Sequence, residues 1–515
     1  MNEIITVLAL IFAVGFAVLI ASRRVGLPVI PALIVSGLFI SPLIALDQIA
    51  DFVVLGITFL VFYIGLRTDL DGFVKVSSDS LNLALFQVIL VFPVGFYVAH
   101  SVGLDSLTSL YVALAASLAS TLAGTDIFDR DLRMNLHHGQ ISTGANFIHD
   151  LIAVIMITSL AVGATLQSVR LGIIAALILL FAFTVRETLS HKIHSFVQGE
   201  ELRLVLMVAV YGAAIGLAEI TALSAILTSF AAGLMFSRGS ETEEFIDVLE
   251  PLKDFFSVIM FVGLGALLTY PSVEVLKIAG LLVVLAAVLR PLLGSLVMLV
   301  DGHGGRKSFK TSLNMIQISE FALAAVIIGW TQGALSMGIL EAVVVATATT
   351  MFISAFAARK LDVLYETVGF PLRKIEELLE YGVKELDIKD HIVLIGYDFR
   401  GQKIAEALEE NFVVVDYSIE NIELAKREGH KHIFGDIQDK KVVEAANISE
   451  ADTVILTSDH RPVRETVKEF EGVEKILVAE ESTGEWGEHF TVLSEKDMKS
   501  EALKNRVKEL VKGKI

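Results

Sequence analysis

The stretch from residue 140 to residue 158 holds the side chains that are best suited to chemistry inside a membrane. It reads QISTGANFIHDLIAVIMIT, which is long and apolar enough to cross a bilayer. Asn146, His149 and Asp150 nevertheless lie near its middle. Because a carboxylate at that depth is costly, such residues usually mark a pathway for an ion or a proton. The stretch therefore predicts that the carboxylate of Asp150 binds either a proton or a cation.

Helical spacing brings these polar groups together. Thr143, Asn146 and Asp150 are three and four residues apart, so they share one face of the predicted helix. His149 is adjacent to Asp150 and can turn toward the same cavity or toward a neighbouring helix. The alternative is that these polar side chains only fix the packing of helices.

Two further apolar runs are interrupted by polar side chains, which we add to the candidate site: Ser120 and Thr121 in the run 108–125, and Gln317 and Glu320 in the run 308–333. Interrupted spans in corresponding positions of two halves are the best sequence indication of a transporter site. The competing explanation for each run is a set of hydroxyl groups that bond back to their own helix.

Arg290 is a further ionisable side chain inside an apolar run, so we expect it to be buried in the membrane. It lies in the run 275–299, followed by Pro291, at a depth that is unusual for an anchor at the membrane surface. Because a buried cation is expected to be paired, Glu320 and Asp150 are its candidate partners.

The composition indicates that these residues are positioned by a polytopic α-helical membrane protein. Apolar residues make up 54% of the 515 residues, charged residues only 19%, and the mean hydropathy is +0.68. We predict about thirteen spans, namely the runs 3–22, 28–46, 49–66, 81–102, 108–125, 137–163, 169–188, 201–218, 220–237, 251–269, 275–299, 308–333 and 336–358. A net charge of -18 argues against nucleic acid as a partner, and the lack of cysteine excludes disulfides and thiolate sites.

The loops predict the orientation in the lipid bilayer. Lys and Arg gather in the loops that follow odd-numbered spans, whereas the opposite loops hold only Arg170 and Lys277. The N-terminus is then outside and the C-terminal part cytoplasmic. We expect a multi-pass protein of a prokaryotic plasma membrane. The fifth and twelfth spans have opposite orientations, as an inverted repeat requires.

The chain changes character after residue 360. We predict a transmembrane domain over residues 1–360, a cytoplasmic linker helix over residues 361–389 and a soluble domain over residues 390–515. In the last part, buried strands such as HIVLIG and NFVVVDYS alternate with helices, which predicts a parallel, Rossmann-like α/β sheet.

The first strand-to-helix turn of this domain suggests a nucleotide site. The candidate ligands share the rim at the ends of the strands: Gly396, Asp398, Gly401, Asp416, Gly435 and Asp436. Asp398 stands where a fingerprint glycine would approach a pyrophosphate, and its charge would repel phosphate. A Rossmann-like domain without a bound dinucleotide is therefore the alternative, and a lone adenosine nucleotide fits better than NAD.

Together these motifs resemble the Kef-type branch of the monovalent cation:proton antiporters, with a C-terminal TrkA-N (RCK-type) domain. SLASTLAGTD resembles the crossing in that family's fifth span, ANFIHDLIAV its phenylalanine–glutamine–aspartate signature, and QISEFALA its glutamine–glycine–glycine–glutamate–phenylalanine motif. IFGDIQD resembles the glycine–aspartate turn of the nucleotide domain. Arg290 falls where related antiporters carry a buried Lys or Arg. The sequence departs from the family at His149, Ile318, Ser319 and Asp398.

The resemblance implies an inverted-repeat antiporter fold with crossed broken helices, in a homodimer. It implies exchange of K+, or alternatively Na+, for H+ at Asp150 by alternating access, and no enzyme activity. It also implies no cofactor for transport, and regulation by an adenine nucleotide (AMP, ADP, ATP or NAD(H)). Two rival functions are a nucleotide-gated cation channel, for which the sequence has no filter motif, and a membrane-anchored oxidoreductase.

Overall fold

The computed structural model describes most of the chain, namely residues 2–25, 28–43, 46–68, 78–120, 137–162, 199–221, 224–237, 241–268, 271–301, 303–369, 388–408, 411–416, 419–435, 440–457, 461–479 and 490–494, with a few isolated positions between them. The chain divides into two compact units. The first is helical and contains Met1–Leu132, His137–Val297 and Phe309–Leu364. The second contains Tyr365–Ile515, together with the short segments Arg133–Leu136 and Met298–Ser308.

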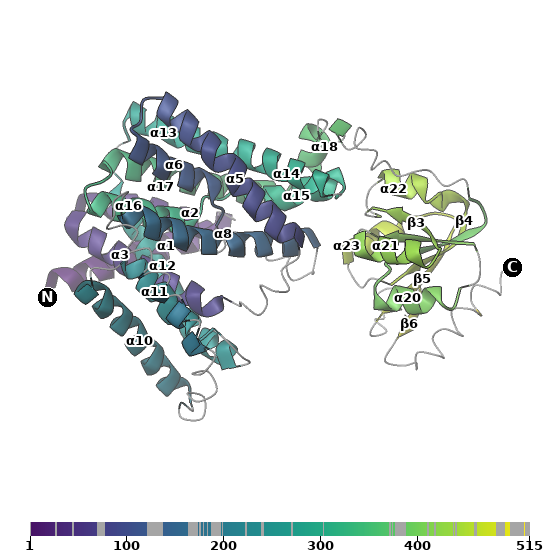
Figure 1. Ribbon diagram of the computed structural model, residues 1–515, viewed down its shortest axis with the longest axis horizontal. Coiled ribbons are helices and arrows are strands. Elements are labelled where there is room, and N and C mark those ends of the chain that lie inside the picture. The colour runs from purple at the N-terminus through teal and green to yellow at the C-terminus, as the bar shows by residue number, and fades with distance from the viewer. Residues whose placement is uncertain are drawn as a thin grey trace. The chain divides into compact units, whose positions relative to one another are not determined.

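Every predicted span except the seventh overlaps a described helix, while most of the seventh lies outside the described residues. The helices, shown in Figure 1, are α1 (Asn2–Val25), α2 (Val29–Ile40), α3 (Leu46–Arg67), α5 (Ser78–Ser101), α6 (Ser106–Ser117), α8 (His137–Val162), α10 (Glu200–Thr221), α11 (Ala225–Leu234), α12 (Glu241–Leu267), α13 (Val273–Val284), α14 (Arg290–Val300), α15 (Gly305–Leu313), α16 (Glu320–Thr331), α17 (Met337–Ala358) and α18 (Leu361–Val368). Among the described residues, six helices are long and apolar enough to cross a membrane by length and composition.

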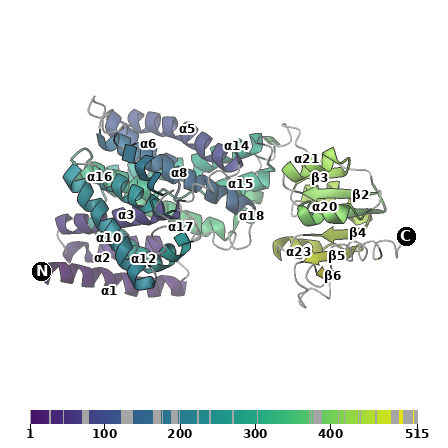
Figure 2. The ribbon, with the colours of Figure 1, turned by 60° about the horizontal axis from the view of Figure 1, so that its bottom comes forward.

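Two helix pairs in this unit pack with their backbones in contact. A Cβ atom on Gly265 of α12 would lie 1.8 Å from the carbonyl oxygen of Ile34 in α2, so only glycine allows this approach. Gly233 of α11 is in the same situation against Phe62 of α3, at 2.0 Å. Because lipid supplies little driving force for helix association, such close contacts are a main source of stability in a membrane. Figures 1 and 2 show α5, α6 and α14 on the other side of the unit from α1, α10 and α12.

The breaks predicted in the fifth and twelfth spans are confirmed, and they meet. Helix α6 ends at Ser117, and α15 and α16 are separated by residues 314–319. Ala119 and Ile318 form an isolated antiparallel bridge. The amide of Ser120 donates to the carbonyl of Gln317 at 3.1 Å, and the amide of Ser319 donates to that of Leu118 at 3.1 Å. The two interrupted spans therefore cross as short extended segments that satisfy each other's backbone groups.

The second unit contains the predicted parallel sheet. Its strands are β1 (His391–Ile395), β2 (Phe412–Asp416), β3 (Lys431–Phe434), β4 (Ala451–Leu456), β5 (Glu474–Ala479) and β6 (Thr491–Ser494), in the order β3-β2-β1-β4-β5-β6. Every pairing is parallel, and Figure 2 shows helices on both faces of the sheet. The last two strands were not predicted. Because the strand order reverses between β1 and β4, a crevice for ligands is expected beside the carboxyl end of β1.

Candidate functional site

The carboxylate at the centre of the candidate site is buried. Asp150 lies on α8 with 2% of its surface exposed, and Asn146, one turn earlier, has 4% exposed. Among the described residues, Asn146 Oδ1 has no hydrogen-bond partner. The structure therefore places a carboxylate and an unsatisfied amide oxygen on one face of α8, as the spacing predicted.

Helix α8 is hydrogen-bonded to the break in the fifth span. Asn146 donates from Nδ2 to the carbonyl of Ser120 at 3.2 Å. The amide of Ala119 donates to Nδ1 of His149 at 3.1 Å. The predicted residues Asn146, His149 and Ser120 thus belong to one network, whereas Thr121 lies outside the described residues.

The partners of His149 fix its tautomer. A backbone amide can only donate, so Nδ1 must be the unprotonated nitrogen that accepts from Ala119. Nε2 therefore carries the proton, and it donates to the carbonyl of Ala84 on α5 at 3.3 Å. The neutral imidazole bridges α5 and the broken fifth span, and a second proton on Nδ1 would remove the acceptor that holds Ala119.

Arg290 binds carbonyl groups of both breaks. From Nη1 it donates to the carbonyls of Ala116 at 3.1 Å and Leu118 at 2.6 Å, and from Nη2 to those of Ile316 at 2.5 Å and Gln317 at 2.7 Å. Its side chain is fully buried. The expectation that Glu320 or Asp150 pairs with this cation is wrong among the described contacts. Broken helices leave carbonyls without intrahelical partners, and the guanidinium has enough donors to satisfy four of them.

A local irregularity aims Arg290 at the crossing. Residues Leu285–Leu289 form a π-turn between α13 and α14, in which the amide of Arg290 donates to the carbonyl of Leu285. Pro291 has no amide hydrogen and its ring crowds the preceding turn, so a wider turn here relieves that clash. On α5, Gln87 donates from Nε2 to the carbonyl of Arg290 at 3.2 Å.

Glu320 lies at the N-terminal, amide end of a broken helix, whereas Arg290 binds carbonyl ends. Glu320 is the first residue of α16 and is 5% exposed, and Ser319 caps the same helix by accepting from the amide of Phe321 at 3.1 Å. A helix N-terminus carries partial positive charge, which favours a carboxylate. Arg290 on the carbonyl ends and Glu320 on an amide end therefore balance the dipoles of the broken helices.

Helix α17 supports the crossing through residues that the sequence analysis missed. Gln317 donates from Nε2 to the hydroxyl of Ser354, and the amide of Ile318 donates to Oγ1 of Thr350 at 3.2 Å. Thr350 and Ser354 are four residues apart in an otherwise apolar run. That spacing, which places two hydroxyls on one helix face, was the available signal.

The rim of the sheet is arranged for part of a nucleotide. Gly396 has a φ of +94°, and a Cβ on Gly401 would lie 2.1 Å from the carbonyl oxygen of Gly396, so the first turn requires both glycines. Asp416 ends β2, where a carboxylate can accept from ribose hydroxyls. Gly435 follows β3 and donates its amide to the carbonyl of Asp416 at 2.9 Å. Asp436 lies outside the described residues.

Asp398 occupies the start of helix α20 (Phe399–Ala405). Its carboxylate accepts from the amides of Arg400 at 3.0 Å and Gly401 at 3.1 Å. These are amides that a pyrophosphate would use in a dinucleotide site, so the rim fits an adenosine group better than the pyrophosphate of NAD.

Tyr397 connects the same turn to Asp416 at the end of β2 and to Glu428 further along the chain. Its amide donates to Oδ2 of Asp416 at 2.5 Å, and its hydroxyl donates to Glu428. Burial, together with that carboxylate, raises the pKa of Tyr397, so its hydroxyl remains a donor. The turn is held by its own side chains in addition to any ligand.

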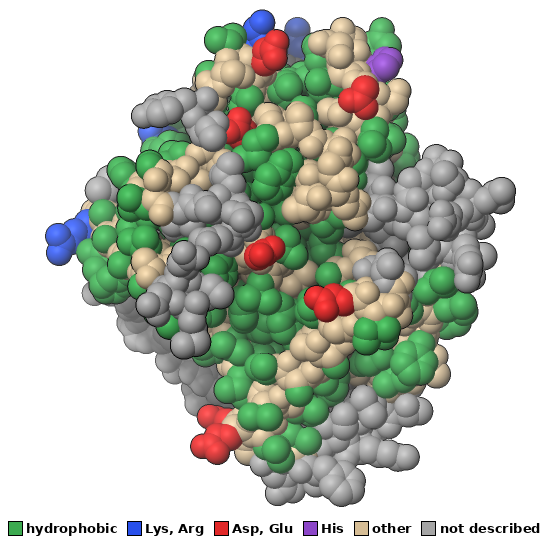
Figure 3. Space-filling model, turned by 90° about the vertical axis from the view of Figure 1, so that its left-hand side faces the viewer, with side chains coloured by type: hydrophobic (Ala, Val, Ile, Leu, Met, Phe, Trp, Pro, Cys, Tyr) green, Lys and Arg blue, Asp and Glu red, His purple; other side chains and the backbone are tan. Residues whose placement is uncertain are grey.

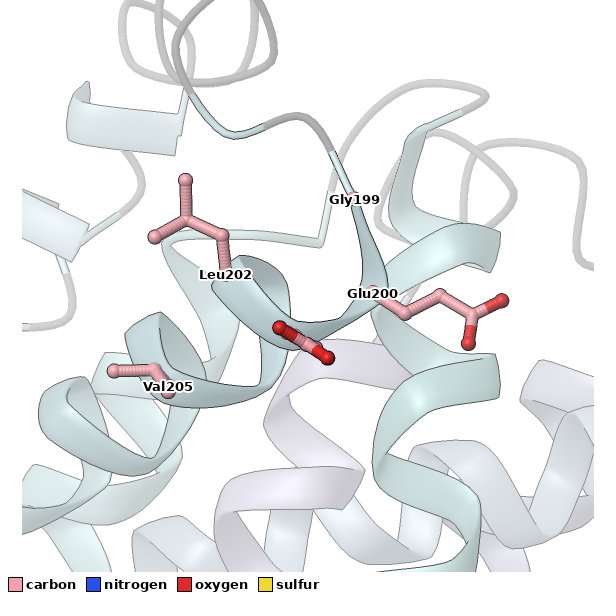
Figure 4. Close-up of a pocket in the computed structure, with 5 residues that line it drawn as sticks. Gly199, Glu200, Leu202 and Val205 are labelled. Atoms are coloured by element: carbon pink, nitrogen blue, oxygen red, sulfur yellow. The ribbon is translucent and has the colours of Figure 1, made fainter.

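A hollow at the start of α10 is separate from both sites. It measures about 590 Å³ and is lined by Gly199, Glu200, Glu201, Leu202 and Val205. Figure 4 shows Glu200 and Leu202 pointing to opposite sides of the helix. None of the residues of the crossing lines it.

The carbonyl contacts of Arg290 lead to a stability prediction. We expect Arg290→Met to lower the free energy of unfolding by at least about 3 kcal/mol, because it removes four buried hydrogen bonds. The carbonyls of Ala116 and Ile316 then lose their donor, while those of Leu118 and Gln317 keep only the backbone amides of Ser319 and Ser120. Arg290→Lys should recover only part of this loss, since one ammonium cannot reach both pairs of carbonyls. Thermal unfolding of the purified protein in detergent measures both. A Glu320→Gln change should add nearly independently, and strong coupling with Arg290→Met would show that a direct ion pair exists.

Comparison with known proteins is consistent with this geometry. Residues 7–359 match the family model described as sodium/hydrogen exchanger, transmembrane, and residues 392–478 match the TrkA-N domain. The putative cation/proton antiporter YbaL of Escherichia coli (strain K12) is 22% identical over 428 residues, which cover 78% of this chain and 76% of that protein. The putative K(+) efflux antiporter KefB of Alkalimonas amylolytica is 21% identical over 485 residues, which cover 88% and 72%.

The fold has a counterpart among solved structures. The sodium proton antiporter MjNhaP1 from Methanocaldococcus jannaschii superposes with a TM-score of 0.55 at 14% identity, covering 70% of this chain and 97% of that one. The family model covers more than half of the chain. The chain therefore belongs to the sodium/hydrogen exchanger family of membrane cation/proton antiporters, which are transporters and not enzymes, and it carries a C-terminal TrkA-N domain.

Proposed function

We propose that the protein exchanges one monovalent cation for one proton at Asp150 by alternating access. The observation that carries this proposal is a carboxylate buried beside the crossing, one helical turn from the unsatisfied oxygen of Asn146. A carboxyl group holds a proton, or once ionised a dehydrated cation, but not both. One such site, open to each side of the membrane in turn, exchanges one ion for the other.

The remaining candidate residues have distinct roles in this proposal. Asn146, Ser120 and Thr121 supply neutral oxygens for the cation, while Gln317 and Glu320 shape the other half of the crossing. Arg290 is a fixed charge that holds the breaks and does not carry a proton. K+ is our preferred substrate and Na+ the alternative, because the chain resembles the Kef-type branch and KefB of Alkalimonas amylolytica is named as a putative K+ efflux antiporter.

We place the protein in the plasma membrane of a prokaryotic cell, as a homodimer with the N-terminus outside. Figure 3 views the molecule from the side where the N-terminus lies in Figure 1. On the visible face, Asp and Glu are scattered among apolar side chains, while Lys and Arg lie at its margin. Scarcity of basic residues is expected of an outer face, which supports this orientation. We assign residues 1–360 to transport, 361–389 to a cytoplasmic linker and 390–515 to regulation.

The TrkA-N domain is proposed to bind an adenine nucleotide at the rim formed by Gly396, Gly401 and Asp416, and thereby to change transport. The capping role of Asp398 favours AMP over ADP or ATP, and any of these over NAD(H), because fewer phosphates then meet its carboxylate. Transport itself needs no cofactor.

The first prediction concerns Asp150. We expect Asp150→Asn to abolish cation-dependent proton flux in proteoliposomes while leaving the melting temperature nearly unchanged, because Asn keeps the shape but cannot ionise. Asp254→Asn, at an exposed carboxylate paired with Lys253, is the matched control and should transport normally. Robust exchange in Asp150→Asn would refute the mechanism.

The second prediction concerns stoichiometry. Because the tautomer of His149 leaves no room for a second proton, we expect electroneutral exchange that an imposed membrane potential alone does not drive. His149→Gln offers one acceptor and one donor, so it should retain transport, with a pH optimum shifted toward lower pH since glutamine does not titrate. His149→Lys, which can only donate, should lose it. Exchange driven by potential in the wild type and lost in His149→Gln would make His149 a second proton carrier.

The third prediction concerns the nucleotide. Millimolar AMP should raise the melting temperature of the TrkA-N domain in the full chain, because a ligand that binds only the folded state stabilises it. The shift should shrink in Asp416→Asn and persist in Asp452→Asn, whose side chain is exposed at the start of β4. If AMP, ADP, ATP and NADH all leave the melting temperature of the wild type unchanged, the nucleotide site is disproved.

A further inference from the structure

Four buried amide side chains around the crossing share one unusual feature. Each donates from its NH2 group to a protein acceptor, and the carbonyl oxygen of each has no hydrogen-bond partner in the described part of the chain: Gln87, Asn146, Asn314 and Gln317. An unsatisfied buried acceptor is costly, so such a repetition calls for an explanation.

The orientation of two of these amides follows from their partners. Asn146 faces the carbonyl of Ser120, which can only accept, so its nitrogen must be the atom that points there. Asn314 lies 3.4 Å from the hydroxyl of Ser142, which already donates its hydrogen to the carbonyl of Gly139 at 3.0 Å. In both cases the unsatisfied atom is therefore an oxygen, and exchanging oxygen and nitrogen would set two acceptors against each other.

These two oxygens lie along one face of α8, in steps of a turn. Ser142, Asn146 and Asp150 are four residues apart, which is about 6 Å along a helix axis. Asn314, at the end of α15, is held at the level of Ser142 and has 2% of its surface exposed. A row of buried oxygens therefore runs from the end of α15 to the carboxylate.

We infer that Asn314 and Asn146 form a second, transient binding position for a monovalent cation, next to Asp150 on the side of α15. The inference rests on the proposed exchange at Asp150. The loop charges place that side toward the cytoplasm. Neutral amide and hydroxyl oxygens replace part of the hydration shell of a monovalent cation and hold it weakly, so that it can move on to the carboxylate. A divalent cation prefers several carboxylate ligands, and the described residues contain no group of three or more His, Cys, Asp or Glu side chains that could hold one.

The test measures the Michaelis constant for the cation on each side of the membrane. Everted vesicles expose the cytoplasmic face and right-side-out vesicles the other. Asn314→Leu keeps the size of the side chain and removes the oxygen, so the cytoplasmic KM for K+ should rise about five- to tenfold, as expected for one lost ligand. The maximal rate and the KM at the outer face should remain within a factor of about two.

Two further variants make the result specific. Asn314→Asp keeps the oxygen and adds a charge, so it should lower the cytoplasmic KM and slow the maximal rate by holding the cation longer. Thr347→Val on α17 is the matched control, because in the described part of the chain that buried hydroxyl bonds only to the carbonyl of Val343 in its own helix. It removes a buried polar group of the same unit and should leave the cytoplasmic KM unchanged.

Accessibility gives an independent readout that does not depend on turnover. Because the chain has no cysteine, Asn314→Cys introduces the sole thiol. A cationic thiol reagent added to the cytoplasmic face should label it, and K+ should slow the labelling. An unchanged cytoplasmic KM in Asn314→Leu, or labelling that K+ does not slow, would overturn the second position while leaving exchange at Asp150 intact. Exchange that survives Asp150→Asn would instead reject the proposed function itself.

Discussion

The hydrogen bonds that the guanidinium of Arg290 donates to four backbone carbonyls are the interaction on which the helical unit depends. Breaking two helices inside a membrane exposes carbonyls where there is no water to receive them, and each one left unsatisfied costs several kcal/mol. One guanidinium collects two carbonyls from each break, through two nitrogens. The charge of Arg290 is therefore stabilised by carbonyl dipoles and does not require a carboxylate as its partner.

Everything else at the crossing is arranged around that set of bonds. Ala119 and Ile318, which directly follow the carbonyls that Arg290 binds, form the antiparallel bridge. The amides of these two residues donate hydrogen bonds to His149 and Thr350, respectively. Because these acceptors come from α8 and α17, the two breaks are fixed from opposite sides. The result is a pair of short extended segments whose backbone groups are hydrogen-bonded without a continuous helix. The charged side chain of Arg290 lies against both segments.

The sequence predicted the apolar helical segments of the described chain and the interruptions of the fifth and twelfth spans, because long apolar runs and polar residues inside them are direct consequences of the bilayer. It predicted the partner of Arg290 wrongly, since backbone carbonyls are present at every position and leave no mark in a pattern of side chains. The support from Thr350 and Ser354 was overlooked for a related reason: hydroxyls in an apolar helix usually bond to their own backbone. In the soluble domain, the first four strands were recognisable from compact apolar runs. EKILVA and TVLS are short and carry polar residues, so β5 and β6 were missed.

The π-turn at Leu285–Leu289 has a consequence for how this segment can vary. A wider turn amounts to one residue more than a regular helix needs, and each residue rotates a helix by about 100°. Straightening the turn without removing a residue would rotate Arg290 by about 100° and swing the guanidinium away from the crossing. The wide turn is therefore as necessary as the identity of Arg290. A homologue with a straight helix here would need its cation at a position shifted by one in the sequence.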